Sequence, residues 1–160
     1  MKNRIIIFTL LISVIFSQSW NTTFIGQLDY PQFVNDVWGY KADNGKEYAL
    51  VGTSLGTAVV DVTTNPFGPQ QVGFITGDES TWRDIKFYNN HMYISTEAEM
   101  GIQVADITDP ENPELVYEWD GVSRAHNLFQ ADGYLYVVGA DEGTDMEILD
   151  LADPAVPVRV

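Results

Sequence analysis

Three Pro-x-x-Pro pairs recur along the chain at one constant spacing, and this internal repeat constrains the fold more than any other feature of the sequence. The first proline of each pair lies 44 residues after the one before, at Pro66, Pro110 and Pro154. An apolar stretch that ends in an aspartate precedes each pair, with the aspartates at Asp61, Asp106 and Asp150. Because several kinds of marker recur together, the sequence predicts one structural unit that is built three times.

Each unit is predicted to contain four short β-strands. Apolar stretches rich in β-branched and aromatic residues alternate with turn signals, such as Asn-Gly at 44–45 and Asp-Gly at 132–133, which favour tight hairpins. No stretch after residue 19 has the periodicity of an amphipathic helix. Four strands in a repeat of about 40 to 50 residues are typical of a β-propeller blade. We therefore predict an all-β fold, a β-propeller of four-stranded blades at residues 35–79, 80–122 and 123–160, with a core that contains Val37, Val51, Val60, Ile85, Ile94, Val104, Leu128, Val138 and Ile148.

Three blades are fewer than the four to eight with which propellers typically close. The last blade is cut short at Val160, which aligns with the start of the outermost strand in the two earlier blades. We therefore expect an incomplete propeller, either because the sequence is truncated or because the chain assembles with other copies. The leader, residues 20–34, contains the segment FIGQLD at 24–29, which resembles the outer-strand segment VGFITG at 72–77. This similarity suggests the leader as a ring-closing strand.

Residues 1–19 have the layout of a secretory signal peptide. Lys2 and Arg4 precede an apolar run at residues 5–16, and the small-x-small triplet at 17–19 follows it. An apolar run of this length is too short to cross a bilayer, which takes roughly 20 residues. We therefore expect a chain that is exported to the cell surface or the extracellular space and that has no transmembrane span after cleavage.

The charge balance excludes one class of partner. The chain has 8 Lys and Arg against 23 Asp and Glu, a formal net charge of −15, with no basic cluster. Such a chain repels the phosphate backbone, so we expect no nucleic-acid partner. Because the sequence contains no cysteine, disulfides and thiolate metal sites are excluded as well.

Several segments resemble a known family, namely NDVWGY from Asn35, EYALVGTSLGT from Glu47, STWRDIKFY from Ser80, GIQVADITDPENP from Gly101 and AHNLF from Ala125. Together they resemble the choice-of-anchor B family of secreted bacterial proteins, which are built from LVIVD repeats and have a β-propeller fold. The similarity spans about residues 22–160. The resemblance implies a secreted or surface-associated propeller, and it implies no established reaction.

A polar pair stands at the start of the first strand in each unit, and the first strands of propeller blades line the central channel. These six candidate ligand-binding residues are Asn35, Asp36, Arg83, Asp84, His126 and Asn127. At one mouth of the channel they would bind a small polar ligand or a hard cation, or hold a water for hydrolysis, with His126 and Asp84 as the catalytic candidates. The alternative is structural: the same groups would form hydrogen bonds between blades.

Two further groups of residues are weaker candidates for a ligand-binding site. Loop carboxylates would suit calcium or simply form a solvated acidic surface, and they are Glu97, Glu99, Asp141, Glu142 and Asp145. Trp82 and Trp119 would stack on sugar rings or belong to the core. No catalytic or cofactor-binding motif occurs. We therefore expect a binding module for an extracellular protein or glycan without a cofactor; the alternative is a hydrolase-like or metal-dependent enzyme with its site at the channel mouth.

Overall fold

The computed structural model describes residues 21–98, 101–141 and 145–160. Within these ranges the chain forms twelve β-strands and no helix, and the strands make three four-stranded antiparallel sheets. The predicted all-β class and the predicted four strands per unit are confirmed. The expected signal peptide at residues 1–19 lies outside the described residues.

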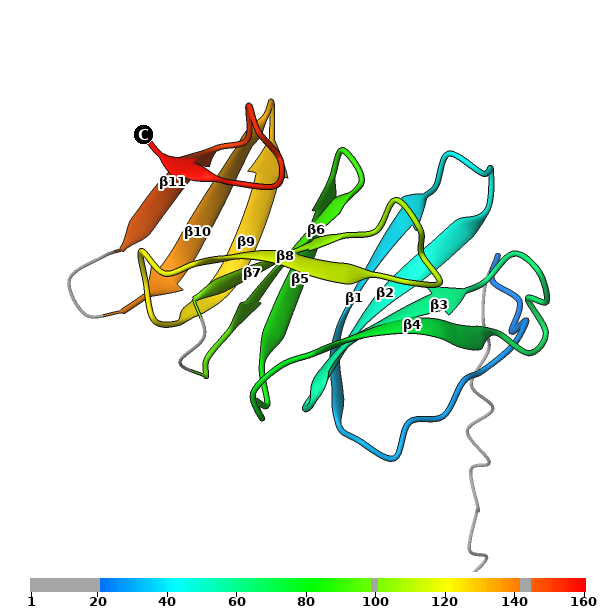
Figure 1. Cartoon of the computed structure of the whole chain (residues 1–160). Coiled ribbons are helices and arrows are strands. Elements are labelled where there is room, and N and C mark those ends of the chain that lie inside the picture. The colour runs from blue at the N-terminus through cyan, green and yellow to red at the C-terminus, as the bar shows by residue number, and fades with distance from the viewer. Residues whose placement is uncertain (1–20, 99–100, 142–144) are drawn as a thin grey trace, which may run out of the picture.

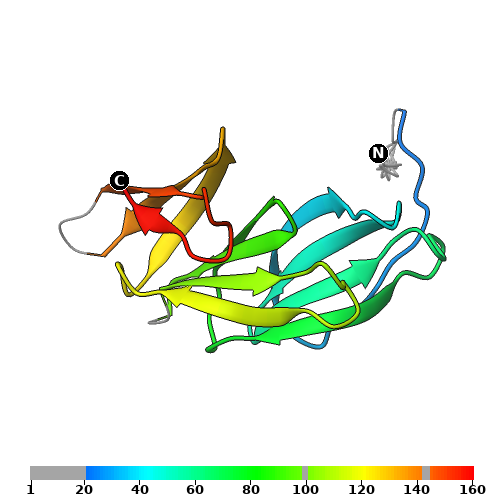
Figure 2. The ribbon, with the colours of Figure 1, turned by 45° about the horizontal axis from the view of Figure 1, so that its top comes forward.

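Each sheet is a meander in which consecutive strands are neighbours. Sheet A contains β1 (Val34–Lys41), β2 (Glu47–Thr53), β3 (Gly56–Asp61) and β4 (Gln70–Thr76). Sheet B contains β5 (Arg83–Tyr88), β6 (His91–Thr96), β7 (Ile102–Asp106) and β8 (Glu114–Trp119). Sheet C contains β9 (Ala125–Ala131), β10 (Tyr134–Ala140), β11 (Met146–Asp150) and the two-residue β12 (Val158–Arg159). The sheets stand side by side in chain order, with sheet B between the other two (Figures 1 and 2).

The hairpin turns follow the local sequence. Asp132 and Gly133 join β9 to β10 with φ values of 51° and 79°. Asn89 and Asn90 join β5 to β6 with φ values of 47° and 63°. Two successive positive φ angles are what a tight type I′ hairpin requires, and Asn, Asp and Gly adopt them at the lowest cost. These turns fix the register of the first two strands in sheets B and C.

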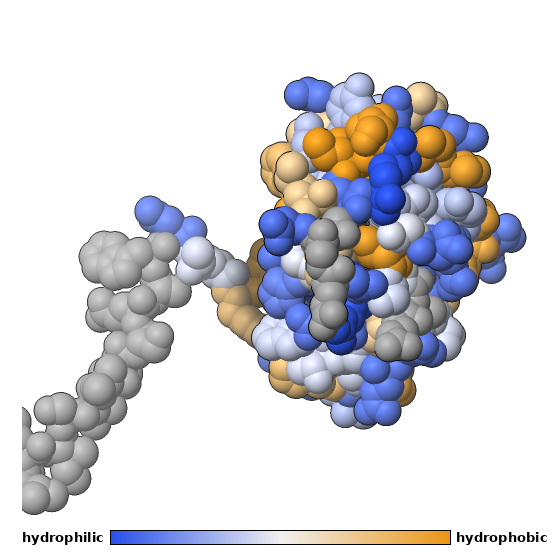
Figure 3. Space-filling view, turned by 90° about the vertical axis from the view of Figure 1, so that its left-hand side faces the viewer, coloured by the Kyte–Doolittle hydropathy of each residue, from blue (hydrophilic) through white to orange (hydrophobic). Residues whose placement is uncertain are grey.

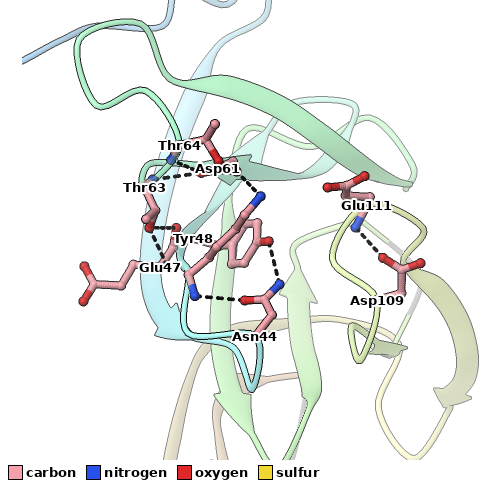
Figure 4. Close-up of polar contacts among 9 residues, drawn as sticks. Asn44, Glu47, Tyr48, Asp61, Thr63, Thr64, Asp109 and Glu111 are labelled. Atoms are coloured by element: carbon pink, nitrogen blue, oxygen red, sulfur yellow. Dashed lines mark hydrogen bonds and ion pairs between the residues drawn. The ribbon is translucent and has the colours of Figure 1, made fainter.

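The aspartate before each proline pair organises the turn that leads to the outermost strand. The Asp61 carboxylate accepts hydrogen bonds from the N–H groups of Thr63 and Thr64, both at 2.8 Å, and from Lys46 Nζ at 2.9 Å (Figure 4). In the other repeats Asp106 accepts from the N–H of Thr108, and Asp150 from the N–H of Ala152, both at 2.7 Å. Burial alone would raise the pKa of Asp61, but its hydrogen bonds, above all those from Thr64, outweigh burial and hold that pKa well below its usual range.

The core lies between the sheets, in two clusters. We call the side of a sheet that looks toward the next sheet along the chain its forward face, and the opposite side its backward face. The forward face of sheet A packs on the backward face of sheet B through Tyr40, Tyr48, Leu50, Val59 and Ile75 against Ile85, Met92, Ile94, Ala105 and Ile107. The forward face of sheet B packs on the backward face of sheet C through Tyr93, Ile102, Val104 and Trp119 against Leu128, Leu135, Val137, Leu149 and Leu151.

Four residues predicted for the core are only partly buried or exposed, and the reason is their place in the row of sheets. Val37 is 61% exposed, and its cross-strand partner Val51 is partly buried, on the backward face of sheet A. Val138 and Ile148 are partly buried on the forward face of sheet C. These faces have the apolar pattern of a core face but no sheet packed on them. The other five predicted core residues are buried.

Candidate functional site

The six candidate residues lie where the sequence predicted, at the starts of the first strands. Asn35 and Asp36 are in β1, Arg83 and Asp84 begin β5, and the pair at 126–127 is near the start of β9. The contacts between sheets include those of β1 with β5 and of β5 with β9. The fold therefore brings successive pairs next to each other, and their chemistry depends on which of their polar atoms are already engaged.

The two aspartates link neighbouring sheets. Asp36 Oδ2 accepts a hydrogen bond of 2.9 Å from the backbone N–H of Ile85 in sheet B. At the equivalent position one sheet later, Asp84 Oδ2 accepts from the N–H of Leu128 in sheet C at 2.5 Å. Burial is the largest influence on Asp36 and raises its pKa, while the bond from Ile85 works in the opposite direction. Each aspartate thus fastens the start of its strand to the first strand of the next sheet.

Lys86 completes this arrangement, and sequence reasoning missed it. Its Nζ lies 2.5 Å from Asp84 Oδ1, and the two side chains are only 10% and 12% exposed. The ammonium also donates to the Ile85 carbonyl at 3.0 Å and lies 4.7 Å from the ring centre of Trp38 in sheet A. The signal was a lysine between the apolar residues Ile85 and Phe87, two residues after Asp84, which is the spacing that places both side chains on one face.

Arg83 and Asn35 are also engaged by main-chain groups. The Arg83 side chain is buried, and its Nε donates to the Thr53 carbonyl of sheet A at 2.8 Å while Nη2 donates to the Asp78 carbonyl. Burial lowers the pKa of Arg83, and the nearby Asp78 charge partly offsets this effect. Asn35 Nδ2 donates to the Thr81 carbonyl at 2.6 Å. These contacts hold sheets A and B together and fix the segment between them.

His126 differs from the other candidates because it reaches the surface. Its Nδ1 lies 2.6 Å from Glu97 Oε1, and the two side chains are 50% and 43% exposed. The Trp82 ring lies 6.1 Å from the imidazole and is 49% exposed. Asn127, the next residue in β9, is exposed as well. We call Trp82, Glu97 and His126 the Trp82 surface; these three residues join the segment before β5, the end of β6 and the start of β9.

The two tryptophans that the sequence left open have different environments. Trp119 is 6% exposed and belongs to the cluster between sheets B and C. Trp82 remains outside both core clusters. Five hollows on the described surface are lined by residues other than the six candidates. The side chains of the Trp82 surface are about half exposed, so a ligand can reach them from the solvent.

The loop carboxylates considered for calcium are only partly covered by the described residues. Asp141 accepts hydrogen bonds from the N–H groups of Ser123 and Arg124 at 2.6 and 2.9 Å, which holds the loop before β9 in place. Glu97 is engaged by His126, and Glu99 and Glu142 lie outside the described residues. Among the residues that the structure describes, no group of three or more His, Asp or Glu side chains is arranged to hold a metal ion.

Comparison with models of protein families found no match, and comparison with curated proteins found none either. Within the described ranges, no helical segment has the length and apolar character needed to span a bilayer.

Proposed function

We propose that this chain is part of a secreted β-propeller that acts as a binding module, and that the Trp82 surface binds a carbohydrate. Three antiparallel meanders of four strands, placed side by side with their first strands adjacent, support the assignment of the sheets as propeller blades. The amino-terminal layout of residues 1–19 supports export.

The observation that carries the proposal is that some candidate residues are engaged between the sheets whereas others are exposed to solvent. The side chains of Asp36, Asp84 and Arg83 form hydrogen bonds between sheets. Trp82 and His126, in contrast, are each about half exposed to solvent. An exposed aromatic ring offers a face for the C–H groups of a sugar, and the adjacent carboxylate and imidazole groups can bond its hydroxyls. The Trp82 surface combines these features in one place.

The hydrolase-like alternative loses its specific support. One of its two catalytic candidates, Asp84, bonds Leu128 and Lys86 through its two oxygens, and the other, His126, bonds Glu97 instead of Asp84. A carboxylate held in this way serves the interface between the sheets. Binding is therefore the function that the geometry favours.

The test is a glycan array followed by calorimetry with a bound neutral oligosaccharide. Trp82→Ala should weaken binding about tenfold, which corresponds to roughly 1.4 kcal/mol, and Glu97→Gln should weaken it less. The matched control is Phe67→Ala, because Phe67 is also exposed, at 79%, but lies in the loop before β4. Binding that Trp82→Ala and Phe67→Ala reduce equally would contradict the assignment, as would the absence of any bound glycan.

A further inference from the structure

The two interfaces between sheets follow one rule of composition. In both, the forward face brings aromatic side chains, such as Tyr40 and Tyr48 in sheet A or Tyr93 and Trp119 in sheet B. The backward face that receives them is mainly aliphatic, as in the sets that include Ile85 or Leu128, with the exception of Phe87 in sheet B, which stacks on Tyr40. A face that carries aromatic side chains therefore packs on a mainly aliphatic face twice in succession.

The two outermost faces of the three sheets, the forward face of sheet C and the backward face of sheet A, have the composition of the two sides of such an interface. The forward face of sheet C carries Phe129, Tyr134, Tyr136, Met146 and Ile148, with Phe129 60% and Met146 53% exposed. The backward face of sheet A carries Val37, Ala49, Val51, Val60 and Val62, which line a surface hollow of about 480 Å³. Apolar surface is visible at the sheet C end in Figure 3. One face carries aromatic side chains and the other is mainly aliphatic, as in the two interfaces already formed.

The leader occupies the place that a preceding blade would give to its outermost strand. Gly73 in β4 packs so closely on the next sheet that a Cβ there would lie 2.6 Å from the Pro110 carbonyl oxygen. Gly26 meets sheet A in the same way, with a Cβ position 2.3 Å from the Pro66 carbonyl oxygen, and Pro66 precedes Pro110 by one repeat. Residues 22–30 form no strand, yet Leu28 and Tyr30 line one side of the hollow.

We propose that the forward face of sheet C docks on the backward face of sheet A in a second copy of this chain, and that two copies close a six-bladed ring. Repetition of an interface that the chain already forms twice is the argument for the second copy as the occupant. Six blades lie within the range in which propellers close. Closure places Asn127 of one copy beside Val37 of the other, so the ring of first-strand residues is complete only in the pair.

One specific contact between the copies follows from the repeat. Ile85 and Leu128 donate their N–H groups to the aspartates of the preceding sheets, and Val37 holds the same register position in sheet A. The Asn127 side-chain oxygen would accept from the N–H of Val37 in the second copy. This interface does not depend on what the Trp82 surface binds, and it is tested by mass.

The test is light scattering coupled to size-exclusion chromatography on the purified chain. The wild-type chain should have the mass of two copies. Phe129→Asp and Val37→Asp should each give the mass of one copy, because each places a charge on an outer face; both parent side chains are about 60% exposed, so the fold survives. A mixture of the two variants should return to two copies, because each retains the face that the other has lost.

The matched control is Val116→Asp, which places the same charge on the exposed side of β8, away from both outer faces. This variant should keep the mass of two copies. A folded wild-type chain with the mass of one copy at every concentration would overturn the proposal, as would a mixture that stays at one copy. A mass above two copies would overturn the closed ring, and circular dichroism of each variant verifies that its β-structure is intact.

Discussion

Removing the Asp84 carboxylate should destabilise the chain more than removing any other candidate site residue. Asp84 pairs with Lys86 at 2.5 Å, and both side chains are nearly buried. In Asp84→Asn the amide oxygen still accepts from the N–H of Leu128, but the Lys86 ammonium loses its counter-ion. Breaking one side of a buried pair costs about 3–5 kcal/mol. We expect about 3 kcal/mol, the lower limit, because Lys86 keeps the Ile85 carbonyl and the Trp38 ring.

A loss of this size is large against a total stability of about 5–15 kcal/mol. Urea unfolding followed by tryptophan fluorescence measures it directly. With a slope of about 2 kcal/mol per molar urea, the midpoint should fall by about 1.5 M. Asp36→Asn is the matched comparison, because Asp36 makes the equivalent bond to Ile85 from a half-buried position. This variant should cost less than about 1 kcal/mol, the value of a single hydrogen bond, because the amide oxygen still accepts from the N–H of Ile85.

The double variant separates the cost of an unpaired charge from the cost of altered packing. Asp84→Asn combined with Lys86→Met removes both charges and conserves volume, so its unfolding free energy should return to within about 1 kcal/mol of wild type. If the double variant is as unstable as the sum of the two single variants, the pair does not act as a coupled buried ion pair. An Asp84→Asn variant indistinguishable from Asp36→Asn would refute the reasoning as well.

Two further predictions concern the leader and acid stability. Gly26→Val should detach the leader, because the new Cβ would lie 2.3 Å from the Pro66 carbonyl oxygen; amide exchange at residues 22–30 should rise, with about 1 kcal/mol lost in global stability, and unchanged exchange would contradict the contact. Stability should also fall as the pH drops below about 4, because several folded carboxylates have lowered pKa values and so bind fewer protons than in the unfolded chain; these are Asp61, Asp106, Asp109 and Asp141. Asp36, whose pKa is raised, works in the opposite direction, and a melting temperature that stays constant from about pH 6 to pH 3 would show that these hydrogen bonds do not persist in solution.

The repeat allowed the strands to be predicted because its signals are local. Positive φ angles at Asp132 and Gly133, and the N–H groups that Asp61 accepts, involve residues adjacent in sequence. Burial could not be predicted with the same accuracy, because it depends on a neighbouring sheet. Val37 and Ile85 hold equivalent register positions and have similar side chains, yet only Ile85 has a sheet packed against it.

The positions of the candidate site residues could be predicted, whereas the hydrogen-bond partners of their side chains could not. A polar pair at the start of a strand suits a ligand or a contact between blades equally well, and the outcome depends on partners far away in sequence. Asp84 meets Leu128, and Arg83 meets Thr53. The exposed pair of His126 and Glu97 spans 29 residues, and the sequence had assigned its two members to different hypothetical sites.

Lys86, two residues after Asp84, explains why the first-strand acceptor changes along the chain. Asp84 is followed by Lys86, which pairs with it and also lowers the pKa of Asp36, against the stronger effects of burial and of Asp84. In sheet C the same positions hold Asn127 and Phe129, so the cation is absent. An aspartate at 127 would cost several kcal/mol once a neighbouring sheet removed it from water, because no cation would compensate it. Asparagine accepts the same N–H bond without a charge. An Asn at position 127, where the lysine is missing, therefore suits a forward face that another sheet covers, as in the proposed pair of copies.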